Sequence, residues 1–268
     1  MTTTGQRGAE ASSIAIGELV AALESLYGRG LFSVVQFGSA VAGEVHDGHS
    51  DTNLLIIVNE VPLAALLTKA AAVQKWTAAG NPAPLLLTLG EWRSSSDIFA
   101  LEYADILHRH QVLAGQSPFD GIEVRPHDLR LHVEREAMGK LLQLRRAIMA
   151  VGTDSGQQLR LLLNGLSTLM VIFRGVVRVA GSPPSTDYVE LSQAVGRLAG
   201  FDAQPFERLV QHARHAVQIL ASDVTPVLTG VLHAMERLVA FLDRAGGSAR
   251  SDGVATQVAP PSSFPGTA

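Results

Sequence analysis

The chain has 268 residues, of which 47% are hydrophobic and 17% are charged, with a formal net charge of −4 and no cysteine. This length predicts one or two domains, and the apolar fraction excludes a disordered chain. The absence of cysteine excludes a disulfide scaffold, a thiolate nucleophile and a cysteine-based zinc site. It is consistent with the reducing cytoplasm, where we expect the protein to reside. The small negative charge argues against broad nucleic-acid binding.

We expect no targeting or membrane segment. Residues 1–12 are polar, lack the apolar region of a signal peptide, and are predicted to form a disordered tail. The most apolar stretch, Leu161–Phe173, is shorter than the about 20 residues of a membrane span, so it predicts a buried helix and no membrane contact. Residues 245–268 are rich in Gly, Ser and Pro and predict a second disordered tail.

Helix and strand patterns alternate over residues 13–125. Ser12 and Ser13 are placed to cap a helix that Gly28 and Gly30 end. A second helix is expected over residues 63–79, and Thr88 with Glu91 forms a capping box for a short third one. Short aliphatic runs predict four strands, at Leu31–Phe37, Asn53–Val58, Leu85–Thr88 and His108–Leu113. The alternation predicts a sheet covered by helices.

After Pro126 only helical patterns remain. Gly165 and Gly175 are small enough to allow close helix approach, and Thr225-Pro226 is expected near the start of the last helix. The expected helices cover residues 128–150, 155–180, 186–199, 205–221 and 224–244. Residues 126–244 are therefore predicted to form an all-α bundle. The fold class is α+β, with a mixed sheet and flanking helices at the N-terminal side and a helical bundle after it.

The most informative segment joins the first two strands. The first strand ends at Gly38-Ser39, and Asp51 and Asn53 open the next strand. Glycine after a strand lets the backbone approach a ligand, and Ser39 adds a hydroxyl, so the pair predicts a phosphate cradle. Asp51 and Asn53 are two residues apart and point to the same face. A carboxylate placed there would hold a divalent cation by oxygen ligation.

This arrangement resembles the nucleotidyltransferase superfamily, which includes DNA polymerase beta and the aminoglycoside nucleotidyltransferases. Gly38, Ser39 and Asp51 match the family signature, and the resemblance covers about residues 13–115. The whole chain is similar to bacterial nucleotidyltransferase domain-containing proteins with a C-terminal helical bundle. The resemblance implies that Gly38 and Ser39 bind the nucleoside triphosphate and that Asp51 and Asn53 form the catalytic pair. It also implies that Asp51 binds Mg²⁺.

Two departures from the family pattern affect the metal site. Asn53 stands where the family has its second carboxylate, which removes a full charge and weakens metal binding by on the order of several kcal/mol. The family's third carboxylate belongs on a later strand, but Leu85–Thr88 contains no acid. The nearest substitutes are Glu91, Glu102 and Asp105. The metal site is therefore expected to be degenerate.

Three functions remain open from the sequence. The first is a nucleotide- or phosphate-binding or regulatory module with little or no transfer activity. The second is an active Mg²⁺-dependent enzyme that moves a nucleoside monophosphate from a nucleoside triphosphate to a hydroxyl of a small molecule or protein. The third is a toxin–antitoxin-like partner. A protein partner or a second copy of the chain would bind through the helical bundle.

Other polar groups carry weaker signals. Glu44, His46, Asp47 and His49 form a loop cluster that is interpreted as solvated rather than metal-binding. His108 and His110 would share a strand face, but no third ligand has the spacing of a zinc site. Arg208 and His215 have the spacing of the ribonuclease motif in HEPN proteins. Leu209 occupies the position that should be polar, which disfavours that activity.

Overall fold

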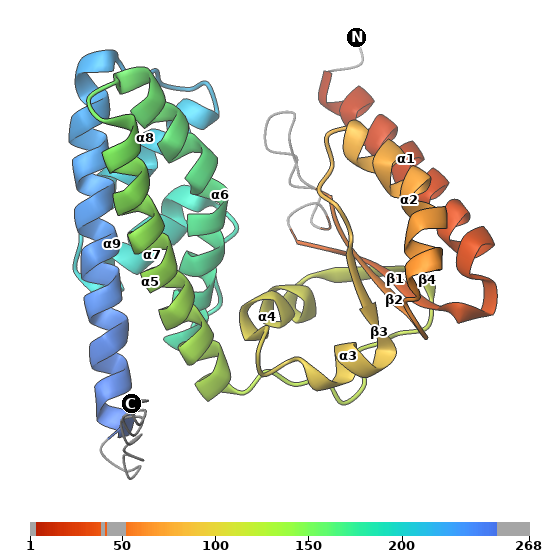
Figure 1. The fold of residues 1–268 in the computed structure, drawn as a ribbon. Coiled ribbons are helices and arrows are strands. Elements are labelled where there is room, and N and C mark those ends of the chain that lie inside the picture. The colour runs from red at the N-terminus through yellow and green to blue at the C-terminus, as the bar shows by residue number, and fades with distance from the viewer. Residues whose placement is uncertain (1–3, 39–40, 42–51, 251–268) are drawn as a thin grey trace, which may run out of the picture.

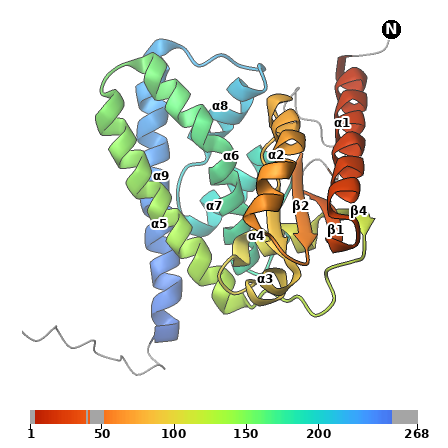
Figure 2. The same ribbon diagram turned by 45° about the vertical axis from the view of Figure 1, so that its right-hand side comes forward.

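The computed structural model describes residues 4–38, 41 and 52–250. It combines a four-stranded sheet and its helices in the first half with a group of long helices in the second half, as Figures 1 and 2 show. The predicted α+β class is confirmed. The predicted domain limits stay a prediction.

The sheet has the strand order β3-β2-β1-β4. Strand β1 pairs antiparallel with both β2 and β4, while β3 pairs parallel to β2. The two central strands are aliphatic and largely buried because helices cover both faces. The strands are β1 (Leu31–Phe37), β2 (Asn53–Val58), β3 (Leu85–Thr88) and β4 (His110–Gly115).

Each face of the sheet has its own helices. Val34 and Ile56 point to one face and pack with Leu19, Leu23 and Trp76. These last three residues belong to α1 (Thr4–Tyr27) and α2 (Leu63–Ala78), which Figure 1 shows along the same side of the sheet.

The opposite face packs against the next two helices of the chain. Val35 and Ile57 lie there in a buried cluster with Trp92, Tyr103 and Ile106. Trp92 belongs to α3 (Leu89–Ser94), and the other two belong to α4 (Ala100–His108). The rings of Trp92 and Tyr103 stack with centroids 4.2 Å apart, and the Tyr103 hydroxyl donates to the Trp92 carbonyl.

The second half of the described chain folds into five helices around one apolar core. Local sequence signals define several of their ends: Asp154 caps α6, Asp187 caps α7, and Pro126 opens α5. The five helices are α5 (Pro126–Val151), α6 (Ser155–Val179), α7 (Tyr188–Ala199), α8 (Gln204–Ala213) and α9 (Ala221–Arg250). Ala100 and Leu101 of α4 also belong to this core, so α4 contacts both halves of the molecule.

Several element limits differ from the sequence-based expectation. Helix α1 begins at Thr4, before the expected caps Ser12 and Ser13. Helix α4 was not expected, and β4 starts at His110 instead of His108. The capping box of Thr88 and Glu91 is confirmed.

The last helices also differ. Helix α8 ends at Ala213, well before the expected residue 221. His215, just beyond it, has φ +55°, a left-handed conformation that does not continue a helix. Helix α9 starts at Ala221, so Pro226 lies within it, and it reaches Arg250.

Two helices are long and apolar enough to cross a membrane by length and composition, α6 and the Ala221–Ala245 part of α9. The expected apolar stretch Leu161–Phe173 lies within α6, which has 25 residues and so extends beyond that stretch at both ends. Half of the apolar window in α6 and 39% of that in α9 are buried inside the molecule. Helices of a protein core pass the same test, so it is weak evidence for a membrane span.

Candidate functional site

Gly38 and Asn53 lie next to each other at one end of the sheet. Gly38 follows β1 with φ +87°, and its N–H donates to the Arg109 carbonyl over 3.2 Å. A Cβ atom on Gly38 would lie 3.2 Å from Nδ2 of Asn53, the first residue of β2. The other two predicted site residues, Ser39 and Asp51, lie outside the described residues.

The strand register defines which side chains share this end of the sheet. Phe37 is opposite Asn53 on one side and opposite His110 on the other. Directly opposed residues of antiparallel strands point to the same face, so all three side chains lie on the face that α3 and α4 cover. The row Asn53–Phe37–His110, together with Gly38, therefore forms the described part of the candidate site.

Strand β3 places an apolar residue where the family resemblance calls for a third acid. Leu85 pairs with Leu55, two residues along β2 from Asn53. Side chains alternate along strands, so Leu85 and Asn53 share a face. Leu85 is 38% exposed, and no acid follows it on this strand.

Glu91, the first substitute acid, has a structural role far from Asn53. Its side chain accepts the Thr88 N–H over 2.7 Å and closes the capping box of α3. The hydrogen bonds with the Thr88 backbone and side chain lower the pKa of Glu91 below its usual value. Thr88 pairs with Val58, about 17 Å along β2 from Asn53, so Glu91 belongs to the other end of the sheet.

Glu102, the second substitute, lies beside a buried histidine. His132 of α5 accepts the Leu101 N–H on Nδ1 over 3.2 Å, which places its proton on Nε2. Glu102 lies 3.7 Å from Nδ1, and Glu136 lies 3.7 Å from Nε2. Burial raises the pKa of Glu102 above its usual value. This cluster lies where the start of α4 meets α5.

Asp105, the third substitute, binds two arginines of α6. Arg174 Nη2 lies 2.8 Å from Oδ2, and Arg178 Nη1 lies 2.5 Å from Oδ1. Burial disfavours the charge on Asp105, but the two guanidinium groups outweigh it and lower its pKa below the usual value. A carboxylate with both oxygens on arginines is a poor metal ligand, because the cations already occupy its lone pairs.

His108 and His110 do not share a strand, which corrects the expectation. His108 is the last residue of α4, and burial with the nearby charges of Arg178 and Arg109 lowers its pKa. His110 begins β4, where Nδ1 lies 2.9 Å from the Ile106 carbonyl and the ring packs on Phe119. A carbonyl only accepts, so Nδ1 of His110 carries a proton.

The described residues do not fit a magnesium site of the family type. They contain no cluster of three or more His, Asp or Glu side chains able to hold a metal ion. At the strand ends they offer the Asn53 amide and the Leu85 side chain, whereas Mg²⁺ prefers carboxylate oxygens. The loop cluster of Glu44, His46, Asp47 and His49 lies outside the described residues.

Two groups of polar residues could be assigned only from the structure. The Asp105 pairs join residues that are 69 and 73 positions apart, so no local pattern predicts them. The one available signal is that Arg174 and Arg178 are four residues apart and share a helix face. The second group contains Arg208 and His215, the two residues with the spacing of the ribonuclease motif. Arg208 forms an ion pair with Asp223, and His215 lies beyond the end of α8.

The fold matches a solved structure over most of its length. That structure is spectinomycin adenyltransferase AAD(9) from Enterococcus faecialis, with ATP and spectinomycin. The TM-score is 0.53 at 13% identity, and the match covers 84% of this chain and 98% of that chain. No family model and no curated protein matches the sequence.

Two toxin–antitoxin structures match less well. One is a toxin–antitoxin with AMP-PNP, at TM-score 0.27 and 19% identity over 50% of this chain and 94% of that one. The other is a mutant of the toxin–antitoxin MntA–HpeT, at TM-score 0.26 and 17% identity over 50% of this chain and 93% of that one. These scores are too low to carry an argument. With the sheet order and the helical second half, the match to the adenyltransferase shows that this chain has the nucleotidyltransferase fold.

Proposed function

We propose that this protein binds a nucleoside triphosphate on a nucleotidyltransferase fold whose metal site is degenerate, and that it acts as a regulatory or interaction module. The observation that carries the proposal is the position of Leu85. It shares a face with Asn53 where the resemblance calls for a third carboxylate. Glu91 and Asp105 do not replace that acid, because each is engaged elsewhere, and Glu102 lies on α4 beside His132 of α5 instead of on β3.

The triphosphate would bind where β1 ends. The Gly38 backbone and the Ser39 hydroxyl would hold its phosphates, because a left-handed glycine leaves room for close approach. Asp51 and Asn53 would lie beside it at the start of β2. The matched adenyltransferase structure, which contains ATP, supports a nucleotide as the ligand.

The alternative is an active transferase. It would move a nucleoside monophosphate from the triphosphate to a hydroxyl of a small molecule or protein and release pyrophosphate. The match to an adenyltransferase over 84% of this chain favours this alternative. Mg²⁺, if bound, would polarise the phosphates, with Asp51 as its carboxylate ligand and the Asn53 amide as a weak second one.

Calorimetry with ATP tests nucleotide binding, and a pyrophosphate-release assay with spectinomycin as the hydroxyl acceptor tests transfer, each in Mg²⁺ and in EDTA. We expect ATP to bind and pyrophosphate release to stay at background. Ser39→Ala should weaken binding about tenfold, since it removes a hydrogen bond to a charged group. Asp120→Ala, an exposed aspartate outside the candidate site, is the matched control and should bind as the wild type does.

Each other outcome has a defined meaning. If ATP and the other triphosphates fail to bind in either buffer, the nucleotide-binding proposal is wrong. If pyrophosphate is released in Mg²⁺ and Asp51→Ala abolishes the release, the active transferase is the correct function.

A further inference from the structure

Helix α5 carries a row of large apolar side chains on its solvent side. Leu131, Met138, Leu142 and Met149 are 42%, 43%, 45% and 77% exposed. At about 100° per residue they fall within an arc of about 40° on the helix. We call these four residues the α5 stripe. Contiguous apolar surface of this kind marks an interaction site more often than scattered exposed residues do.

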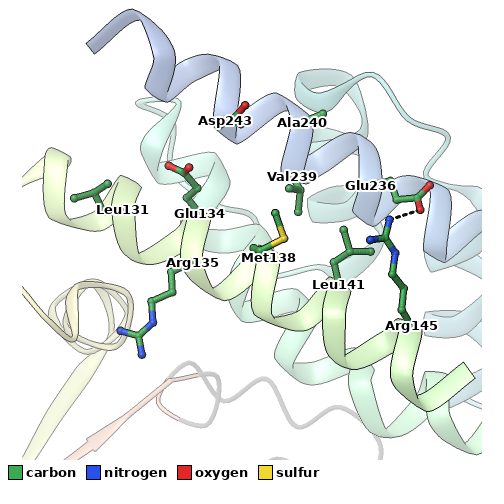
Figure 3. Close-up of a pocket in the computed structure, with 10 residues that line it drawn as sticks. All are labelled: Leu131, Glu134, Arg135, Met138, Leu141, Arg145, Glu236, Val239, Ala240 and Asp243. Carbon is green, nitrogen blue, oxygen red and sulfur yellow. Dashed lines mark hydrogen bonds and ion pairs between the residues drawn. The ribbon is translucent and has the colours of Figure 1, made fainter. Parts of the chain in front are cut away.

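A groove runs beside the α5 stripe, between α5 and α9. Its volume is about 680 Å³. In Figure 3, Met138 points toward Val239 of α9, and Arg145 reaches Glu236 of α9, at 2.7 Å. The groove is lined by residues of these two helices, including Leu131, Met138, Leu141, Val239 and Ala240. The α5 stripe and the groove share Leu131 and Met138, so they form one surface whose apolar side chains are bordered by charged ones.

The spacing of the α5 stripe fits another helix. Successive members are seven, four and seven residues apart, which is the heptad pattern of helices that pack side by side. The same spacing is symmetric about residue 140. In an antiparallel pair of identical helices, Leu131 would lie opposite Met149 of the second copy, and Met138 opposite Leu142.

We propose that the α5 stripe and the adjoining groove form a two-fold interface between two copies of this chain, with their α5 helices antiparallel. A two-fold contact uses the same surface on both copies, so a symmetric stripe is what it requires. This interface is independent of the nucleotide proposal.

The charges beside the groove agree with the antiparallel arrangement. On the α9 side, Glu134 and Asp243 lie toward one end, and Arg145 lies toward the other. Within one copy Arg145 already pairs with Glu236, and Glu134 pairs with Arg130. The two-fold axis brings Arg145 of one copy toward Glu134 and Asp243 of the second. In a parallel pair, each of these charged residues would instead lie at the same height as the identical residue of the second copy.

The outer side of the stripe carries two like charges. Arg135 also lines the groove, and in Figure 3 its guanidinium extends away from α9; Arg146 lies on the same side of α5 by helical period. In the antiparallel pair they approach each other across the interface rim. This repulsion is weak because both side chains are exposed to solvent.

The surface is large enough for a specific contact. From Leu131 to Met149 the α5 stripe is about 27 Å long, and α5 with α9 is about 20 Å wide. The footprint is of the same order as the about 800 Å² that each partner contributes to a standard interface.

Sedimentation velocity of the full chain over a wide concentration range tests the proposal. We expect a monomer–dimer equilibrium in the wild type and a monomer in Met138→Glu, which puts a charge into the middle of the α5 stripe. Leu67→Glu is the matched control, since Leu67 is 70% exposed on α2 and the variant should still form the dimer. Circular dichroism and thermal unfolding show that each variant is folded.

A second variant tests the antiparallel geometry. Arg146→Glu should lower the dimer dissociation constant, by up to about fivefold, because the new carboxylate meets Arg135 of the second copy. A wild type that stays monomeric at every concentration, or a dimer unaffected by Met138→Glu, would overturn the proposal. A weaker dimer in Arg146→Glu would overturn the antiparallel arrangement.

Discussion

Gly38 shows how one residue determines the geometry at the end of β1. Its φ of +87° is a conformation that costs residues with a Cβ atom about 1–2 kcal/mol. Gly38→Ala should therefore lower the free energy of unfolding by about that amount, and Asn53 would also have to move slightly. Urea denaturation measures the change.

Gly139→Ala provides the contrast. Gly139 lies within α5, and a Cβ atom there would meet no atom within 4 Å. Alanine favours the helix by about 0.5–1 kcal/mol, so this variant should be more stable than the wild type. If both variants lost the same free energy of unfolding, the positive φ of Gly38 would not be the cause of its sensitivity to substitution.

Local residue patterns explain how much of the candidate site could be predicted. A glycine after a strand and an aliphatic run predict where β1 ends and where β2 starts. The structure places Gly38 beside Asn53. The absence of an acid on β3 is also visible in the sequence. The engagement of Asp105 is not, because its partners lie on a distant helix. The roles of Ser39 and Asp51 stay predictions.

At the scale of helices, two glycines of α6 behave differently although the sequence suggested one role for both. A Cβ atom on Gly175 would lie 2.5 Å from Val133 of α5 and 2.6 Å from Leu101 of α4. Gly165 has no atom within 4 Å of that position. The expected close approach is therefore confirmed at Gly175 and wrong at Gly165.

This difference predicts effects of opposite sign on stability. Gly175→Ala should destabilise the protein by about 1–3 kcal/mol, because the buried side chains of Val133 and Leu101 must shift to admit the methyl group. Gly165→Ala should stabilise it by up to about 1 kcal/mol through helix propensity. Thermal and urea unfolding of both variants measure the effects. A stabilised Gly175→Ala would mean that these three helices pack less closely than the structure shows.

The same scale shows why α4 escaped prediction while α6 and α7 did not. Asp154 and Asp187 cap α6 and α7 with side-chain hydrogen bonds, which are visible as sequence signals. Phe99, at the start of α4, makes no such bond. The helix is nine residues long and is held by contacts with two cores, and such tertiary contacts leave no local signal.

For the whole molecule, Asp105 is the main ionic connection between α4 and the helical half. Its folded pKa is below the usual 3.8, so the ion pairs with Arg174 and Arg178 contribute fully above that value. Their contribution is lost as the pH falls through the lowered pKa. Asp105→Asn should cost about 3 kcal/mol at neutral pH, because it leaves two largely buried arginines without their anion.

Urea denaturation between neutral pH and about pH 3 measures this dependence. The wild type should lose more stability on acidification than Asp105→Asn does. Asp120→Asn is the control and should follow the wild type, since the Asp120 side chain is exposed to solvent. Parallel pH curves for wild type and Asp105→Asn would contradict the assignment.

The order of the two halves could be predicted, because a sheet needs short aliphatic strands and a bundle needs long amphipathic helices. Their connection could not, since it depends on which side chains of α4 face which core. Ala100 and Leu101 contribute to the helical core, while Tyr103 and Ile106 contribute to the sheet core.

This shared use of α4 has a consequence for cooperativity. If the helical half opened, Ala100 and Leu101 would lose their packing contacts. If the sheet half opened, Tyr103 and Ile106 would lose theirs. Neither half can therefore open without weakening the helix that the other half depends on. The two halves are therefore coupled in unfolding, and a substitution that destabilises one half also lowers the stability of the other.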